Sequence, residues 1–293
     1  MSTGIIYALL SATCFAFLAI FAKLGYNMDI STSNMLFYRF FFASLIFAIY
    51  FALKNPKLFV IKRINLLKAM FAGSILYFLQ SNLFFLAIKN TSVSTASLIL
   101  YLYPLFVTIL SVFIYKQKLN NVTIFSLIFI AIGSCLIFYN AFYNRYSLTG
   151  IAFALGASMV FSCYIIFIQY SLKTQKPLTF SFYVMLFAAL SFSLKADFSF
   201  KFDKNAILLI TGLSFISTFL AITLLYLSIE KIGSMYASIF SSIEPVITVI
   251  ASGLILSEKV DYIQISGMAL ILISIMLPQI KKIEFANYEQ KIT

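Results

Sequence analysis

The sequence of 293 residues contains no histidine and no tryptophan. Without histidine, the chain can form no imidazole metal site, no His-based catalytic triad and no histidine proton relay. Without tryptophan, the eighteen tyrosines must supply any aromatic belt at a membrane interface. We therefore expect no enzyme that depends on an activated histidine, and no cofactor or metal site.

Charged residues are also scarce, at 10% of the chain, whereas hydrophobic residues make up 62%. Soluble domains average about 25% charged and about 45–50% apolar residues. The apolar residues form separate blocks of about twenty, the length at which a helix crosses a hydrocarbon layer of about 30 Å. The composition predicts an all-α polytopic membrane protein.

The net charge of +12 does not indicate nucleic-acid binding, because the basic residues are scattered over short loops. The three cysteines, Cys14, Cys135 and Cys163, all fall inside apolar blocks. They predict small membrane-buried side chains and no disulfide framework. The first block, 4–24, has no basic leader and is long enough to span, so we expect no cleavable signal.

Hydrophobic patterning predicts ten transmembrane helices. They cover residues 4–24, 34–53, 69–88, 94–115, 122–140, 149–171, 179–195, 206–228, 234–256 and 262–280. With the N-terminus inside, thirteen basic residues fall in cytoplasmic segments and seven in outer segments. The excess of inner positive charge predicts a cell (inner) membrane protein with both termini in the cytoplasm. The basic run 54–68 either fixes this topology or binds anionic lipid heads.

The sequence contains an internal repeat. A shift of 141 lays residues 94–136 on 235–277 without a gap, with eleven identities in forty-three positions, including Pro104 with Pro245. A shift of 146 lays 4–24 on 150–170 with seven identities. Since five spans separate the copies, equivalent helices cross the membrane in opposite directions. We expect two inverted five-helix repeats, at residues 1–145 and 146–293.

Three stretches together resemble a known family. They are GIIYALLSATCFAFLAIFAKL, LAIKNTSVSTASLILYLYPLFVTILSVFIYKQKL and LSIEKIGSMYASIFSSIEPVITVIASGLILSEKVDYIQISGMALILIS. In this order they resemble EamA-type members of the drug/metabolite transporter superfamily. The resemblance covers nearly the whole chain and implies five helices in each half, with a central cavity lined by both halves. It also implies export or import of small metabolites, often amino acids.

Glu244, in SSIEPVIT at 241–248, lies about ten residues into the ninth predicted span. A carboxylate near the centre of the membrane costs about 2.5–3.5 kcal/mol, so Glu244 is expected to face a cavity or a partner. Pro245 has no N–H to bond the carbonyl of Ser241, and Pro104 likewise frees the carbonyl of Leu100, so a helix break is predicted at each proline. Such carbonyls can accept a hydrogen bond from an amine or hydroxyl substrate.

Polar residues recur every three or four positions around Glu244 and predict one polar face on the ninth helix. The members are Ser234, Ser238, Ser241, Glu244, Thr248 and Ser252, and the fourth span repeats the pattern with Ser97, Tyr101, Pro104, Thr108 and Ser111. This face either packs closely against another helix or lines the cavity. Tyr103, next to Pro104, joins Tyr101 and Ser241 as a candidate for substrate binding.

Arg39 is the other charge well inside a predicted span. Its guanidinium either snorkels to the headgroups, or pairs with Glu244 or with a substrate carboxylate. The family resemblance favours pairing, because an arginine at this place in the second helix is common there. Weaker candidates for substrate binding are Gln80, Asn82, Ser162 and Tyr164.

These features predict a secondary transporter that moves a small metabolite, such as an amino acid or related amine, by alternating access. Glu244 would either exchange a proton or hold a substrate amine. The alternatives are a passive channel, although repeated charged rings are not seen, and a non-transporting membrane scaffold. An enzyme is not expected, since no span carries two carboxylates and no Gly-rich phosphate loop occurs. The expected partners are a small-molecule substrate and membrane lipids, with proton coupling and a homodimer left open.

Overall fold

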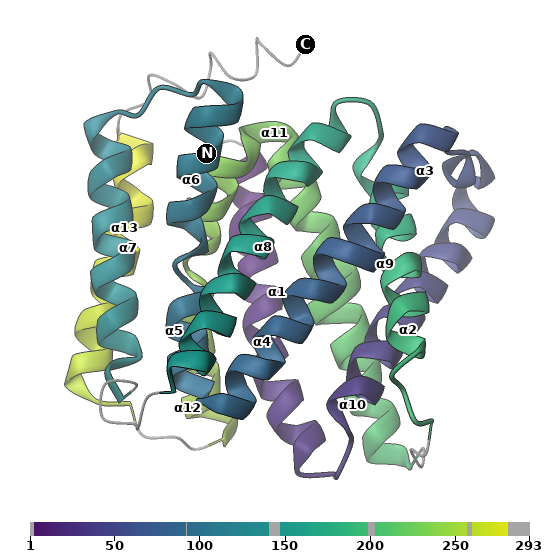
Figure 1. Ribbon diagram of the computed structural model, residues 1–293, viewed down its shortest axis with the longest axis horizontal. Helices are drawn as coiled ribbons and strands as arrows, with labels where there is room; N and C mark the ends of the chain where they lie inside the picture. The colour runs from purple at the N-terminus through teal and green to yellow at the C-terminus, as the bar shows by residue number, and fades with distance from the viewer. Residues whose placement is uncertain (1–2, 92, 141–146, 199–202, 257–259, 281–293) are drawn as a thin grey trace.

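Every regular element in the part of the chain that the structure describes is a helix (Figure 1). The structure, a computed structural model, describes residues 3–91, 93–140, 147–198, 203–256 and 260–280. By length and composition, six helical stretches can cross a membrane, and four shorter apolar helices bring the total to ten. The predicted all-α polytopic fold is confirmed. The predicted division between residues 145 and 146 lies outside the described residues.

The two halves have the same order of elements. The first half comprises α1 (Thr3–Tyr26), α2 (Thr32–Lys54), the 3-10 turn η1 (Pro56–Phe59), α3 (Arg63–Met70), the π-helix η2 (Phe71–Tyr77), α4 (Phe78–Asn90), α5 (Val93–Leu100), α6 (Tyr103–Tyr115) and α7 (Asn121–Ile137). The second half comprises α8 (Leu148–Leu172), α9 (Pro177–Ser193), α10 (Lys204–Ser214), the π-helix η4 (Phe215–Leu220), α11 (Ala221–Ser241), α12 (Glu244–Leu256) and α13 (Tyr262–Ile280).

Gly233 divides α11 into two segments. Its φ of 75° and ψ of 166° are not helical, and glycine reaches such angles without the strain that a Cβ would cause. The segment before Gly233 completes the eighth span, and the segment after it begins the ninth. The chain direction therefore alternates through all ten spans (Figure 1).

Local irregularities recur at equivalent places in the two halves. The first break separates α5 from α6 at residues 101–102, and the second break separates α11 from α12 at 242–243. A shift of 141 lays one break on the other. The third span of each half also contains a π-helix, η2 or η4. The inverted repeat predicted from sequence identities is thus present in the backbone.

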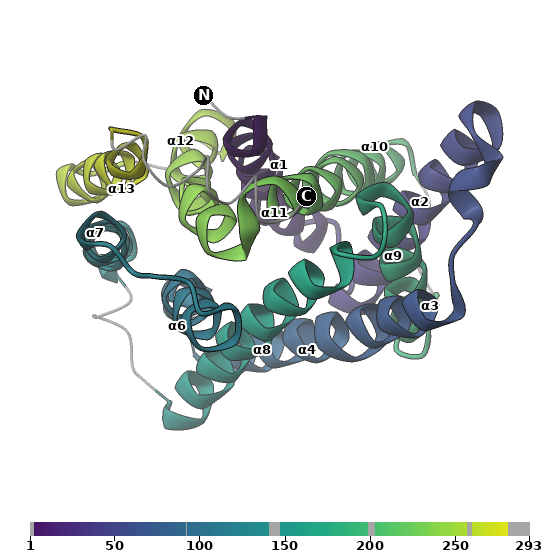
Figure 2. The ribbon, with the colours of Figure 1, turned by 90° about the horizontal axis from the view of Figure 1, so that it is seen from above.

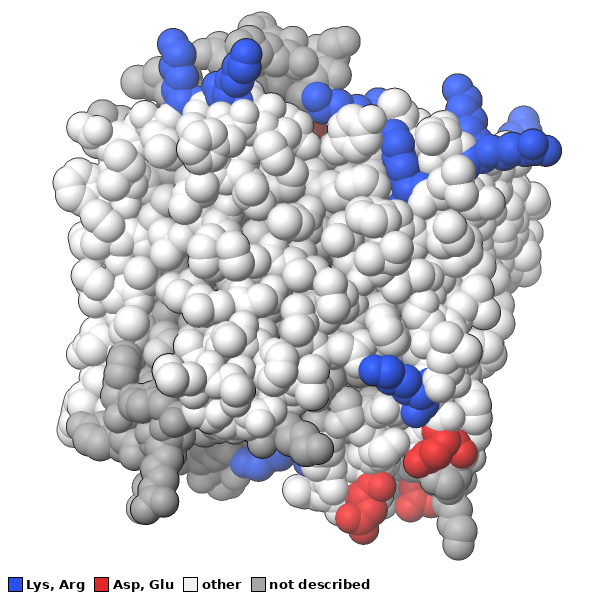
Figure 3. All heavy atoms as spheres, viewed as in Figure 1, with Lys and Arg blue, Asp and Glu red and all other residues white. Residues whose placement is uncertain are grey.

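The charges divide between the two edges of the bundle (Figure 3). The basic edge holds the starts of α1 and α7 and the ends of α2, α6 and α8 (Figure 1). Its described cations are Lys54, Lys57, Lys62, Arg63, Lys68, Lys116, Lys118, Lys173, Lys176 and Lys231. All four aspartates, Asp29, Asp197, Asp203 and Asp261, belong to the opposite edge, together with Lys23, Lys195 and Lys204. Lys281, Lys282 and Lys291 lie outside the described residues.

Helix pairs that join the two halves hold the bundle together. α1 packs on α11, α2 on α9, α4 on α8, and α7 on α13, which lie side by side at one end of the bundle (Figure 2). Between α7 and α13 the backbones approach closely, since a Cβ on Gly133 would lie 2.8 Å from the carbonyl oxygen of Gly267. Small residues at such a contact let two membrane helices gain van der Waals packing.

Candidate functional site

The candidate site lies at the two breaks. The sequence predicted helix breaks at Pro104 and Pro245, inside the fourth and ninth spans. In the structure, α11 ends at Ser241 and a new helix begins at Glu244, so that Pro245 is its second residue. Pro104 takes the same place in α6. Proline is well tolerated there, because the first N–H groups of a helix have no partner inside it.

A hydrogen bond joins the breaks of the two halves. The Tyr101 hydroxyl, at the first break, donates to Oε1 of Glu244, at the second, over 3.0 Å. Glu244 is partly buried, and within the described residues it forms no ion pair. Tyr103 is buried near Glu244 and Ser241, with its ring edge-on to Phe161 at 4.9 Å. The structure thus brings together four of the predicted residues: Glu244, Tyr101, Tyr103 and Ser241.

The first break is held by hydroxyl groups from α8. Ser158 Oγ donates to the carbonyl of Leu100 over 3.1 Å, and Ser162 Oγ approaches the carbonyl of Tyr103 at 3.2 Å. Ser162 also donates to the Ser158 carbonyl over 2.8 Å. Ser162, a predicted substrate residue, is fully buried and therefore supports the backbone of the break.

The second break lacks this support. The positions in α1 that correspond to Ser158 and Ser162 are Ala12 and Ala16, which have no side-chain donor. Thr248 Oγ1 bonds the Glu244 carbonyl over 2.9 Å, but Pro245 has no N–H for the carbonyl of Ser241. The buried Ser241 hydroxyl has no hydrogen-bond partner among the described residues. Polar groups of the second break thus stay available to a ligand.

Arg39 is buried inside the bundle, and its pairing with a substrate carboxylate stays a prediction. Its side chain is only 3% exposed, so it does not snorkel, and it is not bonded to Glu244. Nε donates to Thr218 Oγ1 over 3.0 Å, and Nη2 donates to the Ser217 carbonyl over 3.3 Å. Both partners belong to η4, so Arg39 joins α2 of the first half to the π-helix of the second. The sequence analysis did not single out Thr218 or Ser217. A shift of 141 lays Thr218 on Tyr77 of the first half.

The remaining candidates have local partners. Gln80 accepts from the hydroxyl of neighbouring Ser81 over 3.3 Å. Asn82 donates to the Phe78 carbonyl over 2.6 Å and accepts from Lys195, and neither contact links it to Glu244. Tyr164 is buried, and its hydroxyl lies 2.5 Å from that of Tyr226, a residue that the sequence did not single out.

The predicted polar face divides at the breaks. Above the second break, Ser234 Oγ lies 3.2 Å from Ser111 Oγ, and Ser238 bonds the carbonyl of Met235. These buried serines pack the ninth span against the fourth, as one of the two sequence hypotheses proposed. The other hypothesis, that the face lines a cavity, stays a prediction for Tyr101, Ser241 and Glu244.

A sequence profile of the EamA-like transporter family matches residues 2–139 and 148–278, one stretch in each half of the fold. The chain belongs to the EamA-like transporter family. This EamA-like protein is therefore a membrane transporter, and its family is not one of enzymes. The family resemblance drawn from the three sequence stretches is confirmed.

Individual relatives of the EamA-like protein are also named as transporters. The "Uncharacterized transporter YcbK" of Bacillus subtilis strain 168 is 24% identical over 278 residues, which cover 91% of this chain and 89% of the relative. An "Uncharacterized transporter" of Archaeoglobus fulgidus is 25% identical over 276 residues, covering 93% and 96%. A crystal structure with 13% identity matches with a TM-score of 0.83 over 96% of this chain and 97% of its own, which shows the shared fold.

Proposed function

We propose that this EamA-like transporter is a secondary active carrier that moves a small metabolite across the cytoplasmic membrane by alternating access. An amino acid or a related amine is the substrate class that fits best. The observation that carries the proposal is the hydrogen bond between Tyr101 and Glu244, because it joins the breaks of two inverted halves. Broken helices at the interface of inverted repeats are a recurrent site of substrate binding in transporters.

The chemistry of the second break favours a donor-rich ligand. The Glu244 carboxylate, the Ser241 carbonyl that Pro245 cannot bond and the Ser241 hydroxyl can all accept hydrogen bonds. A substrate ammonium group has three N–H donors and a positive charge that the carboxylate neutralises. Since Tyr101 bonds only one of the two carboxylate oxygens, the other is left for the substrate.

The position of this site between the two halves explains how the substrate would be moved. If one half rocks against the other, the bond from Tyr101 to Glu244 lengthens, and the substrate or a proton replaces the hydroxyl at the carboxylate. The site then opens first to one side of the membrane and then to the other. The cations of the basic edge support an orientation with both termini in the cytoplasm.

The test is counterflow in proteoliposomes, screened with amino acids and amines. We expect saturable exchange that competitors inhibit. Glu244→Gln should abolish it or remove its pH dependence, because the amide carries no charge. Asp29→Asn is the matched control, since Asp29 is an exposed carboxylate in the α1–α2 turn. Non-saturating conductance would instead indicate a channel, and a wild-type rate and pH profile in Glu244→Gln would refute the proposed role.

A further inference from the structure

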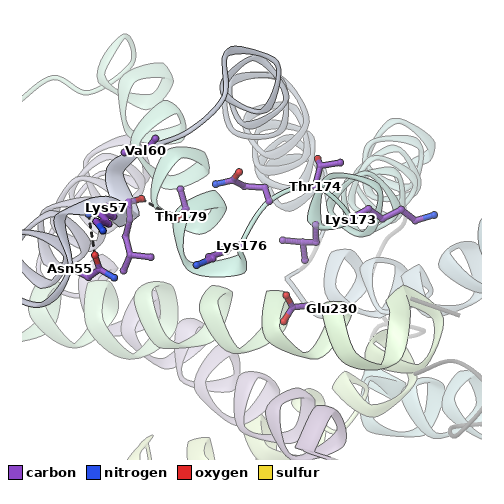
Figure 4. A pocket seen from close by; sticks show the side chains of 11 residues that line it. Asn55, Lys57, Val60, Lys173, Thr174, Lys176, Thr179 and Glu230 are labelled. Atoms are coloured by element: carbon purple, nitrogen blue, oxygen red, sulfur yellow. Dashed lines mark hydrogen bonds between the residues drawn. The ribbon is translucent and has the colours of Figure 1, made fainter. Parts of the chain in front are cut away.

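A hollow lies at the basic edge of the bundle (Figure 4). It has a volume of about 510 Å³ and lies between the α2–α3 connection, the α8–α9 connection and α11. Its lining residues are Asn55, Lys57, Leu58, Val60, Leu172, Lys173, Thr174, Gln175, Lys176, Thr179 and Glu230. Glu244 and Tyr101 are not among them, so this edge pocket is distinct from the candidate site.

Hydrogen bonds between the two halves fix the walls of the edge pocket. Buried Asn65 donates to the carbonyl of Thr174 over 3.2 Å and accepts from its hydroxyl over 3.0 Å. Thr179 Oγ1 donates to the carbonyl of Leu58 over 3.0 Å, and the Tyr183 hydroxyl donates to that of Phe59 over 2.7 Å. Both connections are therefore held in place before any ligand arrives, which lowers the entropic cost of binding.

Positive charge dominates the edge pocket. Lys57, Lys173 and Lys176 line it, against a single carboxylate, Glu230. The Lys173 side chain extends away from the other labelled groups, and its Nζ lies 5.3 Å from the ring centre of Tyr115 (Figure 4). Lys57 and Lys176 are thus the two ammonium groups available to a ligand.

The N-terminus of α9 adds to this positive field. The helix has 17 residues, its N-cap Lys176 makes no side-chain capping bond, and its first turn contains no acidic residue. Pro177 at the first position has no N–H, so the N–H groups of Leu178 and Thr179 are those without an intrahelical partner at the positive end of the helix dipole. With two lysines beside it, this arrangement is suited to a phosphate group.

Glu230 makes the edge pocket selective. It projects from α11, is partly buried, and faces the pocket from the wall opposite α9 (Figure 4). A simple anion would be repelled by this carboxylate. A ligand that carries an ammonium group beside its phosphate would be bound at both ends, because opposite charges then meet at each wall.

We propose that the edge pocket binds an aminoalkyl phosphate. The phosphate group lies between Lys57, Lys176 and the N-terminus of α9, and the ammonium group lies against Glu230. Two sources carry this chemistry: free phosphoethanolamine and the headgroup of phosphatidylethanolamine. The position of the edge pocket, where the membrane helices end, makes it accessible from both the lipid surface and the aqueous phase.

The first experiment measures binding to purified, delipidated protein. Calorimetry with phosphoethanolamine, inorganic phosphate and ethanolamine tests the free source, and native mass spectrometry with phosphatidylethanolamine against phosphatidylglycerol tests the lipid source. We expect the aminoalkyl phosphate to bind at least about tenfold more tightly than its counterpart without the amine, in one arm or both. Equal binding of the counterparts, or no binding in either arm, would overturn the proposal.

The second experiment uses variants. Lys57→Gln and Lys176→Gln should each weaken binding about tenfold or more, because each removes a charge-assisted hydrogen bond. Lys173→Gln is the matched control and should change affinity by no more than about twofold, as expected of an exposed charge. Glu230→Gln should abolish the preference for the amine.

Failure of this proposal is distinguishable from failure of the proposed transport mechanism. Glu244→Gln should bind the aminoalkyl phosphate as the wild type does, because Glu244 does not line the edge pocket. Unchanged affinity in both Lys57→Gln and Lys176→Gln would disprove the site, whatever the outcome of the transport assays. If one of these variants does not fold, the other variant and the ligand selectivity of the wild type still test the proposed site.

Discussion

The two breaks differ in how their polar groups are satisfied. At the first break, Ser158 and Ser162 supply hydroxyl groups to the exposed backbone of α5 and α6. At the second break, alanines occupy the corresponding positions in α1, and Glu244 stands where the first break has Tyr103. One break is thus closed by the protein itself, whereas the other presents a carboxylate and a carbonyl. The same backbone geometry is held by serine hydroxyl groups in one half and, in our account, binds the substrate in the other.

The π-helices show the same kind of asymmetry. In the second half, η4 accepts two hydrogen bonds from Arg39 of α2. In the first half, η2 meets α9 through Gly73, where a Cβ would lie 2.4 Å from the carbonyl oxygen of Val184. One contact is held by a guanidinium, and the other by close backbone packing. A charged group thus lies at each irregular site of the second half: Glu244 at its break, and Arg39, which comes from α2 of the first half, at η4.

The largest effect is expected from breaking the contact between the two breaks. Tyr101→Phe should lower counterflow by about 10- to 100-fold, because a hydrogen bond to a charged group contributes about 1.5–3 kcal/mol. Tyr115→Phe is the control, since it removes a hydroxyl that bonds a backbone carbonyl over the same 3.0 Å. Equal rates in the two variants would show that the contact of Tyr101 with Glu244 has no special part in transport.

The next effect concerns the supported break. The double variant Ser158→Ala, Ser162→Ala should lower the free energy of unfolding by about 2 kcal/mol, at about 1 kcal/mol for each hydrogen bond. Substrate affinity should stay the same, since these serines hold backbone. Thermal unfolding in detergent measures the loss, with Ser171→Ala as the control because its hydroxyl bonds its own helix. A loss of affinity without a loss of stability would reverse the roles that we assign to the two breaks.

A smaller effect is expected at the π-helix of the second half. Arg39→Lys should reduce stability by about 1 kcal/mol, because an ammonium group cannot reproduce the fork that reaches both Thr218 and Ser217. Arg39→Met removes the charge as a comparison. If Arg39→Lys leaves thermal unfolding unchanged but weakens binding of carboxylate substrates, Arg39 contacts substrate in another state of the transporter.

The smallest effect compares two helix caps that are repeat equivalents. Asn120 caps α7 at Thr123, and Asp261 caps α13 at Gln264. Hydrogen bonds from the Tyr139 hydroxyl and from the Gln264 backbone lower the pKa of Asp261. A lowered pKa in the folded state stabilises the fold above the unfolded value of about 3.9, and this stabilisation is lost as the pH falls through the folded value.

Asp261→Asn should therefore lower the unfolding temperature slightly at neutral pH, and the difference from the wild type should vanish in acid. Asn120→Asp is the matched variant in the first half, where the side chain accepts from the backbone N–H of Thr123. Thermal unfolding across a pH series measures both. A difference between Asp261→Asn and the wild type that is the same at every pH would contradict this assignment.

The sequence predicted the ten spans well because hydrophobic length alone sets them, and the repeat followed from identities such as Pro104 with Pro245. It predicted helix breaks at Pro104 and Pro245 but not that a new helix begins at each of them, since a proline fits a kinked helix as well as the start of a new one. The choice depends on donors such as Ser158, which lies 58 residues from Leu100. The partners of Arg39 were missed because the π-helix that presents the Ser217 carbonyl has no clear marker in FISTFL.

The most direct test of the central claim is the accessibility of position 244 from each side of the membrane. Glu244→Cys would be introduced after Cys14, Cys135 and Cys163 have been replaced by alanine, and labelled with a membrane-impermeant thiol reagent. Our account predicts labelling from both sides of the membrane in turn. Labelling only by a lipid-soluble reagent would contradict it, because Glu244 would then face acyl chains and could not bind a ligand between the two halves.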